Sequence, residues 1–187
     1  KLTTIIMAGG KGERLFPLTR DKAKPAITFG GIYRIIDFTL SNCLNSGIRR
    51  IYVLTQYGSF SLDQHLRNAW DIMHPDLGEF IYSMPPQQIM VSRWYRGTAD
   101  SIYQNLTLLE AERPEQVLIL SGDHVYKMNY LEMLDFHLVN RADMTVAAVP
   151  VPRDEARSFG VLKVDATGVL LANLGTPDEP TPAALRR

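Results

Sequence analysis

A short apolar strand that runs straight into a glycine-rich loop constrains this chain more than any other feature of its sequence. Residues 5–12 read Ile-Ile-Met-Ala-Gly-Gly-Lys-Gly. Because glycines carry no side chain, the backbone N–H groups of such a loop stay open, and a polyphosphate can lie directly against them. Further along, Arg14 can bind phosphate oxygens with two parallel hydrogen bonds, and Lys24 can add a compact positive charge. The pattern therefore predicts a nucleoside-triphosphate cradle at the end of a strand.

Two better-known phosphate-binding motifs do not fit this spacing. A P-loop needs a lysine and a serine or threonine after its last glycine, whereas Gly12 is followed by Glu13. The dinucleotide fingerprint opens a helix, and Pro17 makes a helix awkward in the residues that follow the loop. A plain glycine turn between two strands is the competing interpretation, and the fixed order of Arg14, Pro17 and Lys24 argues against it.

Strand and helix patterns alternate along the chain, which predicts an α/β fold with a mostly parallel mixed sheet covered by helices. The expected strands are 3–8, 51–55, 117–120, 143–149 and 159–164. The expected helices are 36–46, 62–70, one that starts with Thr98 as its N-cap and ends before Pro114, and 130–140. The continuous apolar run 117–120 is typical of a buried central strand. Residues 73–92 contain three prolines and read as an irregular connection with short extended pieces.

The loop resembles the G-G-x-G-x-R-L…K-P element of sugar-1-phosphate nucleotidylyltransferases, which join a nucleoside triphosphate to a sugar phosphate and release pyrophosphate. Segments 34–43, 46–50 and 94–100 narrow the resemblance, the last reading Trp-Tyr-Arg-Gly-Thr-Ala-Asp. Together they resemble the bacterial ADP-glucose pyrophosphorylases (glucose-1-phosphate adenylyltransferases) over residues 2–166. The resemblance implies a Rossmann-like nucleotidyltransferase domain that transfers the adenylyl group of ATP to glucose 1-phosphate for glycogen synthesis.

The same resemblance implies roles for individual residues. Asp123 follows the apolar run and would bind Mg²⁺, a cation that takes only one or two protein carboxylates and keeps several waters. Arg14 and Lys24 would be the other catalytic residues, since they would hold the triphosphate. The nucleotide-binding residues would be Ala8, Gly9, Gly10, Gly12, Gln56, Gly97, Thr98, Ala99 and Asp100. The sugar side would have Tyr95 and Gly160, and the regulatory candidates are Lys22, Arg49, Arg50 and Trp94.

Several of these residues also have an ordinary structural interpretation. Asp123 suits a strand-to-loop turn, Thr98 suits a helix N-cap, and Trp94 suits hydrophobic packing. His124 is interpreted as structural, because the four histidines show no metal-site spacing and none pairs with a nucleophile.

Composition excludes several classes of function. Twenty basic and twenty acidic residues cancel, so no basic surface favours nucleic acid or an anionic membrane. No apolar run approaches the ~20 residues of a membrane span. The single Cys43 excludes an intramolecular disulfide and fits a reducing compartment. We therefore expect a cytoplasmic protein without nucleic acid or membrane partners. The resemblance implies that its partners are ATP and glucose 1-phosphate and that it forms a homotetramer.

The resemblance ends near residue 166. In the family a Glu-Lys-Pro element follows the turn 165–168, and its lysine holds the sugar phosphate; this chain has no such element. Instead, residues 169–177 resemble the V-L-L-x-N-L-G-T-P run near the amino terminus of ferrochelatases. We expect 1–167 to be a catalytic domain, incomplete at its C-terminal side and lacking the family's second metal-binding Asp and β-helix domain, and 168–187 to be a foreign-looking tail.

Two alternatives to the interpretation as an adenylyltransferase stay open at this point. The missing lysine favours a non-catalytic nucleotide-binding or regulatory subunit that lacks the sugar-phosphate site. The shared loop is also compatible with a related sugar-1-phosphate nucleotidylyltransferase that uses another nucleotide.

Overall fold

The computed structural model describes residues 1–86, 94–148, 152, 162–164 and 170–172. They belong to two compact units, Lys1–Asp135 and Phe136–Arg187. Among the helices of these described residues, none is long and apolar enough to cross a membrane.

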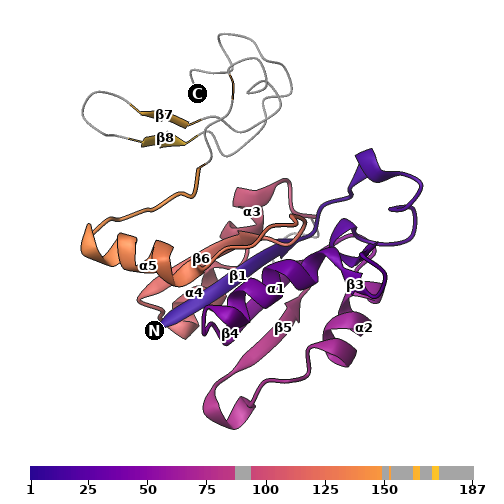
Figure 1. Cartoon of the computed structure of the whole chain (residues 1–187), viewed down its shortest axis with the longest axis horizontal. Coiled ribbons are helices and arrows are strands. Elements are labelled where there is room, and N and C mark those ends of the chain that lie inside the picture. Colours follow the sequence, from indigo (N-terminus) through magenta and orange to yellow (C-terminus); the bar gives the residue numbers. More distant parts are fainter. Residues whose placement is uncertain (87–93, 149–151, 153–161, 165–169, 173–187) are drawn as a thin grey trace. The chain divides into compact units, whose positions relative to one another are not determined.

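A four-stranded parallel sheet forms the centre of the first unit, with strand order β5-β4-β1-β6 (Figure 1). Its strands are β1 (Leu2–Ala8), β4 (Arg50–Thr55), β5 (Phe80–Met84) and β6 (Gln116–Ser121). β1 lies between β4 and β6 and pairs in parallel with both. The strands therefore end at one edge, where Ala8 pairs with Thr55 and Ser121 is the last residue of β6. Ligands of open α/β sheets bind at this carboxyl edge.

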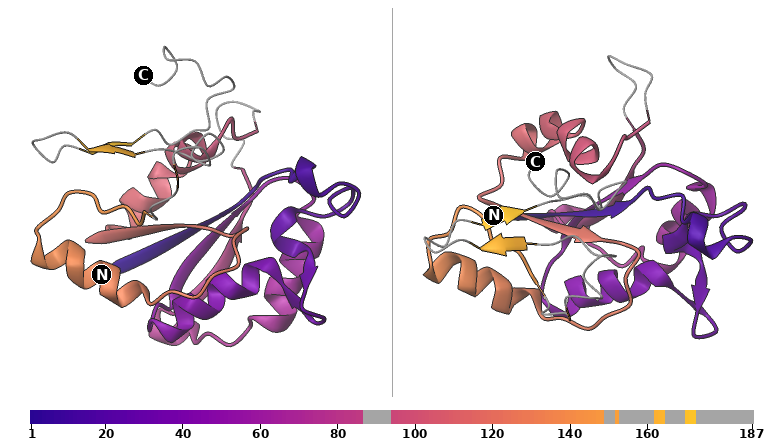
Figure 2. Two further views of the ribbon diagram at one scale, coloured as in Figure 1. Left: turned by 45° about the horizontal axis from the view of Figure 1, so that its top comes forward. Right: turned by 90° about the horizontal axis from the view of Figure 1, so that it is seen from above.

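Helices cover both faces of the sheet. The helices are α1 (Ile35–Asn45), α2 (Phe60–Ala69), α3 (Thr98–Tyr103), α4 (Leu106–Glu112) and α5 (Tyr130–Val139). Single turns of 3₁₀ helix are η1 (Glu13–Leu15), η2 (Lys24–Ala26) and η3 (Pro75–Leu77), and β2 (Thr28–Phe29) pairs antiparallel with β3 (Tyr33–Arg34). Figure 2 shows α1 and α2 on one face of the sheet and α3 and α4 on the other.

α1 owes its position to an apolar stripe that repeats every three or four residues. Ile36, Leu40 and Cys43 lie on this stripe and are fully buried against the sheet core. Burying one such large aliphatic side chain stabilises the fold by about 1.5–3 kcal/mol. The helix ends where the N–H of Gly47 donates to the carbonyl of Leu44 at 2.9 Å, and the next N–H donates to the carbonyl of Cys43. This pair of bonds satisfies the last carbonyls of the helix.

Most elements expected from the sequence are confirmed, with their ends shifted by one or two residues. The helix expected from Thr98 is the first exception, because it is broken into α3 and α4 and its N-cap is Gly97. The buried side chain of Asn105 donates to the carbonyl of Ser101 at 2.8 Å and to the hydroxyl of Tyr95 at 3.0 Å. A side chain that bonds the backbone four residues earlier competes with the helix, and the chain bends there.

The expected burial of residues 117–120 is only partly confirmed in the described part of the sheet, where Leu120 is buried and Leu118 packs against the core. β6 pairs there with β1 alone, and Val117 and Ile119 remain 39% and 47% exposed. Apolarity predicts that a strand forms, but it does not say which neighbours the strand has.

Within the described residues of the second unit, β7 (Leu162–Val164) pairs antiparallel with β8 (Leu170–Ala172). The strand expected at 143–149 is absent over 143–148, the part that the structure describes. A strand needs a neighbouring ladder, and Thr145 instead meets the ring of His137, with 2.9 Å between Oγ1 and Nδ1. β7 and β8 lie on either side of the expected boundary at residues 167–168, and the division of the chain there stays a prediction.

Candidate active site

The glycine loop leaves β1 at the carboxyl edge of the sheet and folds back onto the turn that carries Lys24. Gly12 has a φ of +66°, and a Cβ built there would lie 2.9 Å from both Lys24 Cβ and Thr19 Cγ2. A larger residue at this position would be strained and would collide with its neighbours. The hydroxyl of Thr19 donates to the carbonyl of Gly12 at 3.0 Å and holds the fold-back in place. The loop and Lys24 therefore form one continuous surface.

Lys24 and Asp123, which are 99 residues apart in the sequence, meet at this edge. Lys24 begins η2, and its Nζ donates to Asp123 Oδ2 at 2.9 Å. The other carboxylate oxygen of Asp123 accepts a hydrogen bond of 2.5 Å from the hydroxyl of Ser121, the last residue of β6. The side chains of Lys24 and Asp123 are 28% and 33% exposed, so a ligand can reach both.

The surroundings of Asp123 keep its carboxyl group ionised. Partial burial raises the pKa of Asp123. The hydrogen bonds from Ser121 and Lys24 and the charge of Lys24 lower it by more, so the net pKa lies below the ordinary value. An ionised carboxylate is the form that binds a divalent cation.

Arg34 anchors the turn that carries Lys24. Its guanidinium donates to the carbonyl of Ser61 at 2.8 Å and to the carbonyl of Ala26, the last residue of η2, at 3.4 Å. The backbone N–H of Arg34 in turn donates to Asp37 at 2.8 Å. Lys24 thus projects from a fixed turn.

Two features of the loop leave room for an anion. Arg14 is exposed and makes no hydrogen bond or ion pair with any residue that the structure describes. No atom lies within 4 Å of the position that a side chain on Gly10 would occupy. A guanidinium group without a partner and backbone N–H groups that no side chain covers are both able to bind phosphate.

A second group of expected residues meets where β4 ends. Gln56 is buried, and its Oε1 accepts a hydrogen bond of 2.8 Å from the backbone N–H of Tyr95. A Cβ on Gly9 would lie 3.0 Å from Gln56 Cβ, so the loop packs directly against this glutamine. The glycine loop, Gln56 and the segment 94–100 therefore adjoin one another.

Of the remaining expected site residues, Thr98, Ala99 and Asp100 lie on this segment or at the start of α3. Asp100 closes its turn by accepting from the backbone N–H of Arg96 at 2.9 Å and from the amide of Gln104 at 2.8 Å. Thr98 and Ala99, in the first turn of α3, are exposed. Ala8, the last residue of β1, is buried beneath the loop. Gly160 lies outside the described residues.

A known protein family matches most of this chain. The sequence model of the family described as Nucleotidyl transferase matches residues 3–182. This chain belongs to the nucleotidyl transferase family.

Curated relatives of this nucleotidyl transferase share a common description. It is 57% identical over 164 residues to glucose-1-phosphate adenylyltransferase 2 of Vibrio vulnificus, a match that covers 88% of the chain and 41% of the relative. It is 55% identical over 180 residues to glucose-1-phosphate adenylyltransferase of Rhodopirellula baltica, covering 96% and 40%. For the enzyme of that name from Koribacter versatilis the identity is 56% over 162 residues, covering 86% and 39%. The chain thus spans about two fifths of the length of these relatives.

The regulatory candidates of this nucleotidyl transferase do not form one cluster. Lys22 lies beside Gly58, whose Cβ would be 3.1 Å from the Lys22 carbonyl carbon, just beyond the carboxyl end of β4. Arg49 and Arg50 lie at the other end of that strand, about 20 Å away at the usual rise per residue. Arg49 pairs with Glu79 at 4.0 Å, while Trp94 is exposed on the segment beside Gln56. Their regulatory role stays a prediction.

No group of three or more His, Cys, Asp or Glu side chains that could hold a metal occurs among the described residues. A site that relies on substrate phosphates needs fewer protein ligands, and Asp123 alone fits one. His124 Nε2 lies 3.6 Å from Asp123 Oδ1 on an exposed side chain.

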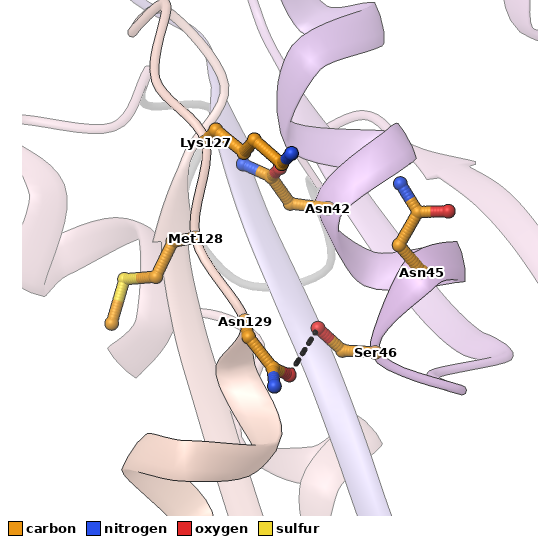
Figure 3. A pocket seen from close by; sticks show the side chains of 6 residues that line it. All are labelled: Asn42, Asn45, Ser46, Lys127, Met128 and Asn129. Atoms are coloured by element: carbon orange, nitrogen blue, oxygen red, sulfur yellow. Dashed lines mark hydrogen bonds between the residues drawn. The ribbon is translucent and has the colours of Figure 1, made fainter.

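A separate pocket of about 340 Å³ lies between the end of α1 and the residues before α5 (Figure 3). It is lined by Asn42, Asn45, Ser46, Lys127, Met128 and Asn129. Ser46 donates to Asn129 Oδ1 at 3.3 Å and accepts from the N–H of Tyr130 at 2.9 Å, while Asn42 donates to the carbonyl of Tyr126 at 3.0 Å. These groups fasten the loop to α1, and the pocket is not part of the site at the carboxyl edge.

Sequence reasoning missed two contributors to the site. Ser121 was not singled out, although it stands only two residues before Asp123 and its hydroxyl bonds that carboxylate. Tyr57 was also missed, and it stacks on Trp94 with 4.8 Å between the ring centroids. Its only sequence signal is an aromatic side chain directly after Gln56.

Proposed function

We propose that this chain is the nucleotide-binding and catalytic part of a glucose-1-phosphate adenylyltransferase. The reaction transfers the adenylyl group of ATP to glucose 1-phosphate and releases pyrophosphate, with ADP-glucose as the product for glycogen synthesis. The single observation that carries the proposal is the Lys24–Asp123 contact beside an open glycine loop at the carboxyl edge of the sheet. The description shared by relatives at 55–57% identity supports the choice of ATP and glucose 1-phosphate.

The chemistry needs no covalent intermediate with the enzyme. A phosphate oxygen of the sugar phosphate attacks the α-phosphorus of ATP in line, that P–O bond forms, and the bond to pyrophosphate breaks. The protein must hold two polyanions at the correct distance and stabilise charge on the leaving group. Electrostatic contacts that are already in place before the reaction suit this task.

Each charged group at the edge then has a defined task. Arg14 and the backbone of Gly9 and Gly10 hold the β- and γ-phosphates, and Lys24 turns from Asp123 toward the α-phosphate. Asp123 is the residue that would hold Mg²⁺. When bound, this ion neutralises phosphate charge and helps to orient the triphosphate.

The base and the sugar are placed on the side of Gln56. Gln56 and residues 97–100 form the edge of the adenine slot, and Tyr95 with Gly160 faces glucose. The bond from Tyr95 N–H to Gln56 supports this arrangement, because it brings the base-side and sugar-side segments together.

The setting of the enzyme is also part of the proposal. A buried free Cys43, whose pKa burial raises to about 12, suits the reducing cytoplasm. The resemblance to the bacterial enzymes suggests a homotetramer with regulatory contacts at Lys22, Arg49, Arg50 and Trp94.

The decisive experiment measures pyrophosphate release by the purified chain in Mg²⁺. ATP, UTP and dTTP are each paired with glucose 1-phosphate, galactose 1-phosphate and mannose 1-phosphate, and nucleotide sugars are identified by mass spectrometry. We expect ADP-glucose as the main product. A preference for UTP or dTTP would contradict the nucleotide assignment, and ATP binding without turnover by a folded chain would favour a non-catalytic nucleotide-binding subunit.

A further inference from the structure

Tyr57 lies between a cation of the glycine loop and an aromatic ring of the nucleotide-side segment. On one side, Lys11 Nζ lies 5.0 Å from the centroid of the Tyr57 ring. On the other, Trp94 is stacked on Tyr57 at 4.8 Å with an interplanar angle of 11°. The neighbouring pair, Gln56 and Tyr95, is joined by a hydrogen bond of 2.8 Å. Two adjacent contacts therefore connect the end of β4 to residues 94 and 95.

The contact of Lys11 with the ring is the weaker of two interactions open to this ammonium. Lys11 is exposed and has no carboxylate partner within the part of the chain that the structure describes. A cation over an exposed aromatic ring is only weakly held, whereas a charge-assisted hydrogen bond to phosphate is considerably stronger. A polyphosphate on the loop would therefore draw Lys11 away from Tyr57.

We propose that Tyr57 is a positioning residue that holds Lys11 while the phosphate site is empty and transmits its release to Trp94. Binding of a polyphosphate moves Lys11 from the ring to the phosphates and changes the environment of the Tyr57–Trp94 stack. Because Tyr95 follows Trp94 and is tied to Gln56, the change reaches the segment that faces the base. The inference rests on the proposed role of the loop in binding a nucleoside triphosphate.

This arrangement predicts competition between the ring and the phosphates. Since the ring binds Lys11 only in the empty state, Tyr57→Leu should tighten the binding of inorganic tripolyphosphate by about two- to fivefold. Tyr57→Phe is the matched control, because it keeps the ring face and removes only the hydroxyl. It should bind tripolyphosphate as the original chain does.

Tryptophan fluorescence tests whether the release of Lys11 changes the environment of Trp94. The chain has two tryptophans, and the other one, Trp70, follows α2, where its Nε1 donates to Asp37 at 2.8 Å. Saturating tripolyphosphate should change the emission of the original chain and of Tyr57→Phe. The change should be absent in Trp94→Phe and in Lys11→Met, with binding in each verified by titration calorimetry.

Two outcomes would overturn the inference. One is Tyr57→Leu binding tripolyphosphate no more tightly than the original chain, and the other is a Trp94 signal that persists in Lys11→Met. These measurements use no sugar phosphate, so they are independent of turnover. A chain that makes no ADP-glucose but shows the Tyr57-dependent effects would refute the proposed function alone, and the reverse result would refute the inference alone.

Discussion

The two edges of the central sheet both carry cations beside a carboxylate, but they use them differently. At the carboxyl edge, Lys24 meets Asp123 in a partly exposed pair, and Arg14 nearby has no partner among the described residues. At the amino edge, Glu112 accepts from Lys1, Tyr52 and Arg50 at once. The carboxyl edge leaves charged groups accessible to a ligand, whereas at the amino edge the charged groups pair with one another.

At the amino edge the charges are paired within the fold, although the buried Nε of Arg50 has no hydrogen-bond partner among the described residues. Arg50 also donates to the carbonyl of Gly78 at 2.8 Å, and its guanidinium lies 5.0 Å from the ring centroid of Phe80. Burial, followed by the hydrogen bond to Glu112, raises the pKa of Tyr52 to about 12. Burial also raises the pKa of Glu112, but hydrogen bonds from Lys1, Tyr52 and Arg50 outweigh it and lower the net value. A shifted pKa is therefore no mark of catalysis by itself. What separates the edges is whether an exposed cation, such as Arg14, is left without a partner among the described residues.

The largest expected effect is on turnover at the carboxyl edge. Lys24→Met and Asp123→Asn should each lower the rate of the proposed ADP-glucose synthesis by about 10²–10³. Lys24→Met removes a preorganised positive charge that faces the phosphates, and Asp123→Asn removes the carboxylate that would hold Mg²⁺. Initial rates with saturating ATP and glucose 1-phosphate test this.

Glu112→Gln is the matched control, since it also removes one carboxylate charge from a cation cluster. Its turnover per folded molecule should stay within about twofold of the original, a margin small beside the loss expected at the carboxyl edge. Equal losses in Glu112→Gln and Asp123→Asn would mean that the two edges do not differ in function.

The second effect is on stability, where the variant at the amino edge should lose more than the variant at the carboxyl edge. Glu112→Gln should lower the free energy of unfolding by about 1–3 kcal/mol, because it leaves partly buried donors of Arg50 and Tyr52 with a poorer partner. Asp123→Asn should cost less, since both members of its pair are partly exposed to water. Urea unfolding followed by circular dichroism measures both. A larger loss in Asp123→Asn would make its carboxylate chiefly structural.

Local patterns account for much of the first unit and for part of the site. The glycine loop follows from sequence alone, because open backbone after a strand is a local property of residues 5–12. Family resemblance assigned Lys24 and Asp123 to one site but did not predict their direct contact. These residues are 99 positions apart, and the parallel pairing of β1 with β6 brings their segments together. Periodicity located the strands without their neighbours, so the exposure of Val117 and Ile119 was missed.

Other features depend on tertiary contacts that no local pattern contains. The stack of Tyr57 on Trp94 arises because β4 ends beside the segment 94–100, and neither residue has a periodic signal. The break at Asn105 depends on the hydroxyl of Tyr95 lying within 3.0 Å of its amide. Lys22 and Arg50 were grouped as regulatory candidates by resemblance. The structure places them at opposite ends of β4, which the sequence pattern does not reveal.

The third expected effect is within the loop, where two glycines separate ligand contact from folding. Gly12→Ala should destabilise the chain by about 1–2 kcal/mol, because φ is +66° and the new methyl group would meet Lys24. Gly10→Ala should leave stability almost unchanged, since no atom lies within 4 Å. It should still weaken ATP binding, because the methyl group would occupy the surface on which the phosphates lie. Unfolding and ATP titration of both variants test this, and unchanged ATP affinity in Gly10→Ala would contradict a phosphate contact there.

The smallest expected effect is the acid dependence of the two edges. The pKa values of Glu112 and Asp123 both lie below their ordinary values in the folded chain. Such a carboxylate contributes stability above its unfolded pKa, about 4, and loses that contribution as the pH falls through the folded value. The stability gap between the original chain and Glu112→Gln should therefore be constant from about pH 6 to 8 and should shrink below about pH 4. The gap for Asp123→Asn should shrink over the same acid range but from a smaller starting value, because Asp123 has two donors and Glu112 has three. Urea midpoints between pH 3 and 8 measure both gaps. A gap for Glu112→Gln that widened on acidification would show that its carboxylate is not the acceptor that stabilises the amino edge.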